Sequence, residues 1–284
     1  MDVLVQGALT SATLALVALG FSLVYGVARI VNLTHGSFFM IGAYAAYATD
    51  QAGAPLLVAA IVGVGAAAVG GLLLDLLVLK RLKHQEVALL IATLSAAVLI
   101  DSVVRYIYGA QDRRLPSFAS GATDIFGVQV LSSRVVAGVV AAITIAIVLA
   151  ILRFTPVGRM VRAVAEDSEA AVLIGIRPDR VTMAVVVIGS ALAGLAGVMA
   201  APYAVVNPTM WLLPLTQAFA IVILGGLGSV NGTILAALIV GFLDRFVAFT
   251  FSGGEIYVGL ITIAVILTTL VVRPSGLLGK AVAH

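Results

Sequence analysis

Apolar segments long enough to cross a lipid bilayer recur along almost the whole chain. A helical span needs about 20 apolar residues, and 62% of the 284 residues are hydrophobic against 10% charged. A water-soluble domain of this size has too little interior to bury so much apolar surface, so the surrounding solvent must be lipid. Seven segments reach spanning length, at residues 3–28, 55–79, 87–108, 133–153, 181–205, 229–250 and 255–272.

Two further apolar segments, 36–49 and 209–224, are short, and each follows a break that contains an asparagine. We therefore predict an all-α fold, a polytopic transmembrane helical bundle of eight or nine spans with short broken helices. The bundle forms a single transmembrane domain over residues 1–284. The high glycine content (29 residues) suits helices that pack closely in a membrane.

Basic loops indicate the topology, because Lys and Arg are enriched on the cytoplasmic side. The loop around Lys80 and the polar stretch 153–180 should both be cytoplasmic, and so should Arg29 if the N-terminus is outside. Segment 36–49 must then cross the bilayer, preceded by unwound chain at 31–34. The outer loop 109–131 ends in a predicted hairpin at 125–128, and it either contacts an external partner or simply connects two spans.

Similar four-residue sequences occur at the two breaks. The first span runs into Val-Asn-Leu-Thr (31–34), and a later span runs into Val-Asn-Pro-Thr (206–209). Under this topology the two units point in opposite directions, as in transporters built from inverted repeats around a substrate path. The match is either such a repeat or a chance similarity.

Polar residues inside the apolar segments are few, and one group follows the first break. A helix that begins within the membrane directs free N–H groups toward whatever lies before it, which suits a carboxylate. Alternatively, these side chains only satisfy the backbone groups that the break frees. We predict that a translocation path is lined by Asn32, His35, Gly36 and Ser37, with Asn207 facing them.

Two pairs of charged residues also fall inside spans. Asp101 and Arg105 stand four residues apart, so they can neutralise each other on one helix face. Asp244 and Arg245 are adjacent and cannot face each other on a helix. They either line a polar cavity or bind another subunit.

The longest polar interval, residues 153–180, should fold into short helices at the membrane surface. Thr155-Pro156 is a helix-start signal, Asp167 can cap a second short helix, and Gly175 can close it in the left-handed conformation. Ala170, Ala171 and Ile174 are spaced to share one side of that helix, where small residues would admit a partner. The alternative is a solvated cytoplasmic face whose charges matter little.

The chain carries no motif for chemistry of its own. It has no cysteine, no HExxH, no GxSxG and no GxxxxGK[ST] pattern. We therefore expect no enzyme activity, no cofactor and no metal site. A net charge of +3 in a membrane protein reflects loop orientation and does not indicate a nucleic-acid partner.

Four blocks of the sequence carry a resemblance to a known family: GVARIVNLTHGSFFMIGAY (26–44), VGRMVRAVAEDSEAAVLIGIRPDRV (157–181), NPTM (207–210) and AIVILGGLGSVNGTILAALIVG (220–241). They resemble the permease subunits of bacterial branched-chain amino acid ABC importers, specifically the shorter, H-type permease, and the resemblance covers nearly the whole chain. Glu169-Ala170-Ala171 followed by Gly175 fits the start of the EAA–G signature of importer permeases in general. The apolar-Leu-Pro that closes that signature is absent here, as it is in this family.

This resemblance implies an inner-membrane permease with four kinds of partner: cytoplasmic ATPase subunits, a sibling permease, an external substrate-binding protein and membrane lipid. Similar permeases move leucine, isoleucine and valine, but also urea, short amides or aromatic acids. An ATP-independent secondary transporter or channel is the alternative from another class. The resemblance assigns ATPase coupling to the central block, with Arg159, Arg162, Glu166, Asp167, Glu169, Ala170, Ala171 and Gly175.

Overall fold

The computed structural model of the protein describes residues 1–83, 85–251, 253–273 and 275–279. Its elements, in chain order, are α1 (Asp2–Ala28), α2 (His35–Gln51), α3 (Leu56–Leu74), the π-helix η1 (Asp75–Leu79), α4 (Lys80–Leu82), α5 (Glu86–Tyr108), β1 (Ala122–Ile125), β2 (Val128–Leu131), α6 (Ser132–Phe154), α7 (Pro156–Glu166), α8 (Ser168–Leu173), α9 (Pro178–Ala200), α10 (Leu212–Gly225), α11 (Val230–Thr250), the 3-10 turn η2 (Gly254–Tyr257) and α12 (Val258–Val272).

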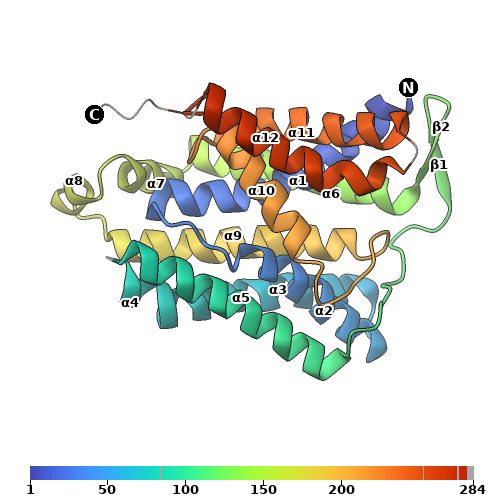
Figure 1. Ribbon diagram of the computed structural model, residues 1–284. Coiled ribbons are helices and arrows are strands. Elements are labelled where there is room, and N and C mark those ends of the chain that lie inside the picture. Colours follow the sequence, from blue (N-terminus) through green and yellow to red (C-terminus); the bar gives the residue numbers. More distant parts are fainter. Residues whose placement is uncertain (84, 252, 274, 280–284) are drawn as a thin grey trace.

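The long helices lie side by side along one common direction, which gives the molecule two distinct ends (Figure 1). Helices α4, α7 and α8 lie at one end, here called the coupling end, and the β1–β2 hairpin lies at the other, the hairpin end. Lys83 forms a 3.2 Å ion pair with Asp179 at the start of α9. Arg29 donates a 3.2 Å hydrogen bond to the carbonyl oxygen of Ala165 in α7. The three basic regions that were expected on one side therefore do share one end of the bundle.

Each apolar segment predicted from the sequence contains a helix. Within the described residues, six helices are long and apolar enough to cross a membrane: α1, the continuous helix Leu56–Leu82, α5, α6, α9 and α11. The helices α2 and α10 are short, as expected. Segment 255–272 is shorter than predicted, because residues 254–257 form a 3-10 turn and α12 begins only at Val258.

The two broken units, α1 with α2 and α9 with α10, run in opposite directions through the bundle. After α1 the chain turns back at the coupling end, and α2 continues to the hairpin end, where Tyr47 accepts a 3.4 Å hydrogen bond from Arg113. After α9 the chain turns back at the hairpin end, where Val206 bridges to Arg113. Helix α10 then ends at the coupling end, close to the segment in which Gly228 packs on Gly26 of α1. This is the antiparallel orientation that an inverted repeat requires.

Glycines allow the central helices to approach each other closely. A Cβ added at Gly20 of α1 would lie 2.6 Å from the carbonyl oxygen of Gly189 in α9. One added at Gly42 of α2 would meet the backbone of Gly194, five residues further along α9. Because lipid offers no hydrophobic driving force between helices, such close backbone packing supplies much of the association energy. Helix α9 is thereby held between α1 and α2 at the centre of the bundle.

The predicted hairpin is present at the end of the outer loop. Strands β1 and β2 pair antiparallel with Ile125 opposite Val128. The two turn residues, Phe126 and Gly127, have φ angles of 53° and 79°. Positive φ at both central residues is the geometry of a tight two-residue hairpin, which matches the twist of the flanking strands.

This arrangement predicts the outcome of cysteine labelling in the cysteine-free chain. Cysteines introduced at Leu82 and Ser168 should react with a membrane-impermeant reagent from the same side, because both positions lie at the coupling end. One introduced at Ser120, next to the hairpin, should react only from the opposite side. Labelling is compared in intact cells and inverted vesicles, with the unsubstituted chain as the blank. Reaction of positions 82 and 168 from different sides would contradict the fold.

Candidate transport path and coupling site

The two broken helices meet inside the bundle near their N-terminal ends. A Cβ added at Gly36, in the first turn of α2, would lie 2.5 Å from the carbonyl oxygen of Trp211 and 2.7 Å from Cβ of Leu215. Trp211 immediately precedes α10, and Leu215 lies in its first turn. Only glycine fits at this position without a shift of the α10 backbone. The first turns of the two short helices, with their free N–H groups, are therefore packed together within the protein.

The unwound chain before α2 is held by hydrogen bonds that the sequence alone did not reveal. The backbone N–H of Thr34 donates to Oδ1 of Asn32 at 3.0 Å, and Oγ1 of Thr34 donates to the carbonyl oxygen of Thr93 at 2.7 Å. The N–H of Leu33 donates to Oγ1 of Thr93 at 3.4 Å. Asn32 thus does satisfy backbone freed by the break, and Thr93 of α5 is a partner that only the folded chain identifies.

His35 and Ser37 are fully buried at the start of α2. Nε2 of His35 lies 3.0 Å from the carbonyl oxygen of Val17, and the edges of Phe21 and Phe38 flank its ring. Three side-chain atoms here are buried without a hydrogen-bond partner in the described chain: Nδ2 of Asn32, Nδ1 of His35 and Oγ of Ser37. Buried polar atoms are nearly always satisfied, so this cluster has polar capacity that the fold itself does not use.

Asn207 does not join that cluster through any of its hydrogen bonds. Its Nδ2 donates to Asp112 of the outer loop at 3.4 Å, and its Oδ1 accepts from Thr209 at 3.0 Å. The residues of the second unit that contact Gly36 are Trp211 and Leu215 instead. Asn207 therefore closes the loop at the hairpin end, because the second break spans more residues than the sequence match suggested.

The segment between α6 and α9 folds into the short helices that the sequence predicted. Oγ1 of Thr155 accepts a 3.2 Å hydrogen bond from the N–H of Gly158, and Pro156 occupies the first turn of α7. We expect Arg159 and Arg162 to hold this element through Glu166 or Asp167, or through lipid phosphates. In the structure Arg162 donates to the carbonyl oxygen of Leu152 at the end of α6. A helix C-terminus carries unsatisfied carbonyl groups and partial negative charge, which a guanidinium complements.

Helix α8 begins and ends at the predicted residues. Oδ1 of Asp167 accepts from the N–H groups of Glu169 and Ala170 at 2.9 and 3.0 Å. Gly175, with φ 84°, follows the helix in the left-handed region, and its N–H donates to the carbonyl oxygen of Val172. The carboxylate of Asp167 is thus occupied in capping α8.

The distribution of exposed side chains on α8 corrects one expectation. Ala170, Ala171 and Ile174 do not present one common face, because Ala171 is 2% exposed and packs against the bundle. The exposed apolar side chains are those at the tip, at 55% for Val172, 88% for Leu173 and 72% for Ile174. Their hydrophobicity is evident from the sequence, but only the fold shows that they are exposed while Ala171 is buried.

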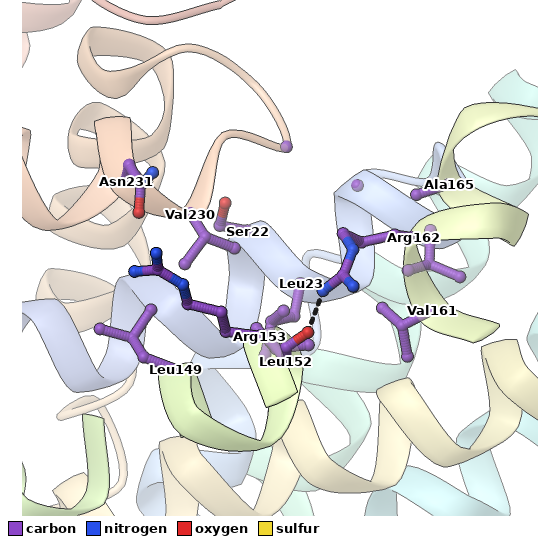
Figure 2. Close-up of a pocket in the computed structure, with 13 residues that line it drawn as sticks. Ser22, Leu23, Leu149, Leu152, Arg153, Val161, Arg162, Ala165, Val230 and Asn231 are labelled. Atoms are coloured by element: carbon purple, nitrogen blue, oxygen red, sulfur yellow. Dashed lines mark hydrogen bonds between the residues drawn. The ribbon is translucent and has the colours of Figure 1, made fainter. Parts of the chain in front are cut away.

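A cavity of about 570 Å³ lies behind this element, between α1, α6, α7 and the start of α11. Figure 2 shows Arg153 extending between Leu149 and Asn231, and Arg162 directed at Leu152. The guanidinium of Arg153 also lies 5.5 Å from the ring centroid of Phe154. The residues that line the cavity include two arginines and no acid, so the junction between α7 and the bundle is electropositive.

The two intramembrane charged pairs differ in their contacts and burial. Arg105 contacts Asp101 at 3.3 Å, as the four-residue spacing predicted, on a largely exposed helix. Asp244 is buried and accepts a 2.9 Å hydrogen bond from Nε2 of Gln217 in α10. Asp244 and Arg245 both line a second cavity. This outcome supports the first of the two roles expected for them.

Comparison with known proteins adds to this geometry. The high-affinity branched-chain amino acid transport system permease protein LivH of Escherichia coli (strain K12) is 28% identical over 97% of this chain and 94% of its own length. The corresponding protein BraD of Pseudomonas aeruginosa is 27% identical over 98% of this chain and 95% of its own. PsaBC from Streptococcus pneumoniae, solved in complex with Fab, shares the fold, with a TM-score of 0.56 and 15% identity over 97% of this chain and 93% of that one.

A family model described as "Branched-chain amino acid transport system / permease component" matches residues 3–270. The match covers every helix from α1 to the last turn of α12. This chain is a multi-pass membrane protein that belongs to the branched-chain amino acid transport system permease family.

Proposed function

We propose that the chain is the permease subunit of an ATP-driven importer in the bacterial inner membrane. It carries branched-chain amino acids that an external substrate-binding protein delivers. The printed names of LivH and BraD support the substrate class. Urea, short amides and aromatic acids are the alternative substrates within the same kind of importer.

The observation that carries the proposal is the exposed apolar tip of α8. Val172, Leu173 and Ile174 are exposed on and just after α8, which lies at the coupling end (Figure 1). Three adjacent apolar side chains in water mark a surface that another protein covers. The caps at Asp167 and Gly175 hold this tip in a defined helix rather than a mobile loop. A partner ATPase that receives the tip in a groove can transmit its movement through α7 to the bundle.

The transport path is proposed to run past the junction of the broken helices. The unpartnered atoms of Asn32, His35 and Ser37 support this placement, because a passing substrate or its water can use their hydrogen-bonding capacity. Gly36 belongs to the same route through its contact with α10. Asn207 then belongs to the outer entrance, where it bonds Asp112.

A sibling permease and lipid are proposed to cover the remaining exposed helices. Only 17% of an 18-residue apolar stretch of α5 is buried within the chain, and 22% of such a stretch of α6. A path formed by two permeases needs such faces, and the rest of that surface meets lipid. We expect a heterodimeric core with two cytoplasmic ATPases.

Co-purification and reconstitution test this function. The chain, its sibling permease, the ATPases and the binding protein are placed in proteoliposomes, and labelled leucine uptake is measured. Uptake should require both internal ATP and the binding protein, and unlabelled isoleucine or valine should compete. Uptake driven by an ion gradient without ATP would favour the secondary transporter. Competition by urea, acetamide or an aromatic acid, but not by valine, would reassign the substrate.

A further inference from the structure

A cavity of about 400 Å³ lies in the half of the bundle toward the hairpin end, here called the Asp244 cavity. Its volume falls within the range of small-molecule sites in proteins. Most of its wall is apolar, and its charged side chains and Gln217 come from α6, α10 and α11. The apolar side chains that line it include Leu9, Leu14, Val17, Phe39, Leu213 and Val258.

Asp244 contributes a carboxylate oxygen that the protein does not use. The side chain is 1% exposed, and its Oδ2 accepts the hydrogen bond from Gln217. Its Oδ1 is buried and has no hydrogen-bond partner in the described chain. An acidic side chain inside a membrane is costly and is usually kept for function, paired with a cation or a hydrogen-bond donor. The free oxygen therefore indicates a donor or cation that is not part of this chain.

Positive charge lines the same cavity. Arg134, at the start of α6, donates to Oε1 of Gln6 at 3.2 Å and lies 5.3 Å from the ring centroid of Tyr203. These contacts fix the guanidinium while leaving several of its five N–H donors for other partners. Arg245 lines the cavity as well. A guanidinium held in this way matches the two oxygens of a carboxylate.

The cavity also adjoins the broken-helix junction. Val17 lines it, and the carbonyl oxygen of the same residue bonds His35. Phe39 comes from the first turns of α2, and Leu213 from the first turn of α10. A molecule in the cavity would therefore lie next to the proposed transport path.

The combination of groups selects the class of ligand. A simple carboxylate would satisfy the arginines but would be repelled by Asp244. A simple amine would satisfy Asp244 but would bring no anion to Arg134. A zwitterion with an apolar side chain complements the acid, the bases and the wall together.

We propose that the Asp244 cavity binds an α-amino acid with an apolar side chain. The ammonium group donates to Oδ1 of Asp244, the carboxylate accepts from Arg134 and Arg245, and the side chain packs on the apolar wall. This assignment rests on the proposed transport function, for which it names a substrate site within this one chain.

Substrate protection of a single cysteine tests the site. Thr10 lines the cavity, and Thr10→Cys in the cysteine-free chain gives one thiol for the membrane-permeant reagent N-ethylmaleimide. Membranes that hold the importer without its binding protein are labelled with and without leucine. Leucine should slow the reaction, whereas 4-methylpentanoate and 3-methylbutylamine, which each lack one charged group, should not. The thiol of Ser120→Cys in the outer loop should react equally in all cases.

The Asp244→Asn change keeps the shape of the side chain and removes its charge. It should raise the leucine concentration that gives half protection by about 30-fold or more, as expected for one lost partner of a buried charge pair. The matched change Asp101→Asn, on α5 and outside the cavity, should leave that concentration unchanged. A thiol that the reagent cannot reach, or equal protection by 4-methylpentanoate in the otherwise unsubstituted Thr10→Cys chain, would overturn the proposal.

The same membranes separate this inference from the proposed function. ATP-driven leucine uptake by the complete importer, without protection of Thr10→Cys, would remove the site and leave the function standing. Protection by leucine in a chain that supports no ATP-driven uptake would keep the site and remove the function.

Discussion

Replacement of Gly36 by leucine is expected to abolish amino-acid uptake. Even the first carbon of the new side chain would lie 2.5 Å from the carbonyl oxygen of Trp211 and 2.7 Å from Leu215. Because the first contact is a main-chain atom, it can be relieved only by moving the start of α10 away from α2. Overpacking of this kind costs typically 1–3 kcal/mol, and more where backbone must move. Uptake normalised to the amount in the membrane, and the melting temperature in detergent, measure the two effects.

A matched leucine at Gly65 provides the control. A Cβ at that position of α3 meets nothing within 4 Å, and the residue is exposed. Gly65→Leu should therefore keep normal uptake and stability. Normal uptake by Gly36→Leu would show that the close contact of the broken helices is unimportant.

Ser37→Ala separates a transport role from a purely architectural one. The hydroxyl of Ser37 is buried without a partner in the described chain, so its removal should not weaken the fold. Reduced uptake at unchanged stability is the result expected if Ser37 lines the path. Unchanged uptake would leave Ser37 a packing residue.

Charge at the tip of α8 is expected to abolish ATPase docking. Leu173→Asp combined with Ile174→Asp places two carboxylates in the surface that we propose a partner covers. Both side chains are mostly exposed, so the change should leave the permease folded and inserted. Loss of a buried apolar anchor at an interface costs about 2 kcal/mol or more, which weakens binding roughly 30-fold. Pull-down of the ATPase by the detergent-solubilised permease measures this loss, and uptake should fall with it.

Two further variants serve as controls for the role of the α8 tip in docking. Phe126→Asp changes an equally exposed apolar residue at the hairpin end and should leave ATPase docking intact. Ala171→Trp, by contrast, should lower the stability of the permease itself, because Ala171 is buried against the bundle. ATPase binding by the double aspartate variant at wild-type strength would place the coupling surface elsewhere.

Local signals determined the positions of the helices. Runs of apolar residues predicted where α1, α5, α6 and α11 lie, because a helix in lipid must be apolar along its length. The starts and ends of the short helices in residues 153–180 were equally predictable. Thr155-Pro156, Asp167 and Gly175 act on the backbone within three or four residues, so their roles as helix start, cap and closing residue follow from the sequence itself.

The opposed directions of the two broken units were predictable from the order of basic residues along the chain. Arg29 and Lys83 belong to basic regions separated by whole spans, and the positive-inside rule needs only the order of charges along the chain. The structure gathers those regions at one end through contacts with Ala165 and Asp179.

Tertiary structure alone decided which polar residues meet. The sequence placed Asn207 opposite Asn32, but the folded chain brings Trp211 and Leu215 against Gly36 and leaves Asn207 with Asp112. A four-residue sequence match does not give the number of residues in an irregular break. Each extra residue in the break changes the position of every side chain that follows it.

The exposed and buried faces of α8, and the contents of the Asp244 cavity, also required the fold. Ala171 and Ile174 differ in exposure because the bundle covers only one side of a six-residue helix. Asp244, Arg134 and Gln217 come from three different helices. Residues so far apart in sequence share a cavity only once the helices have packed, and no local pattern encodes that packing.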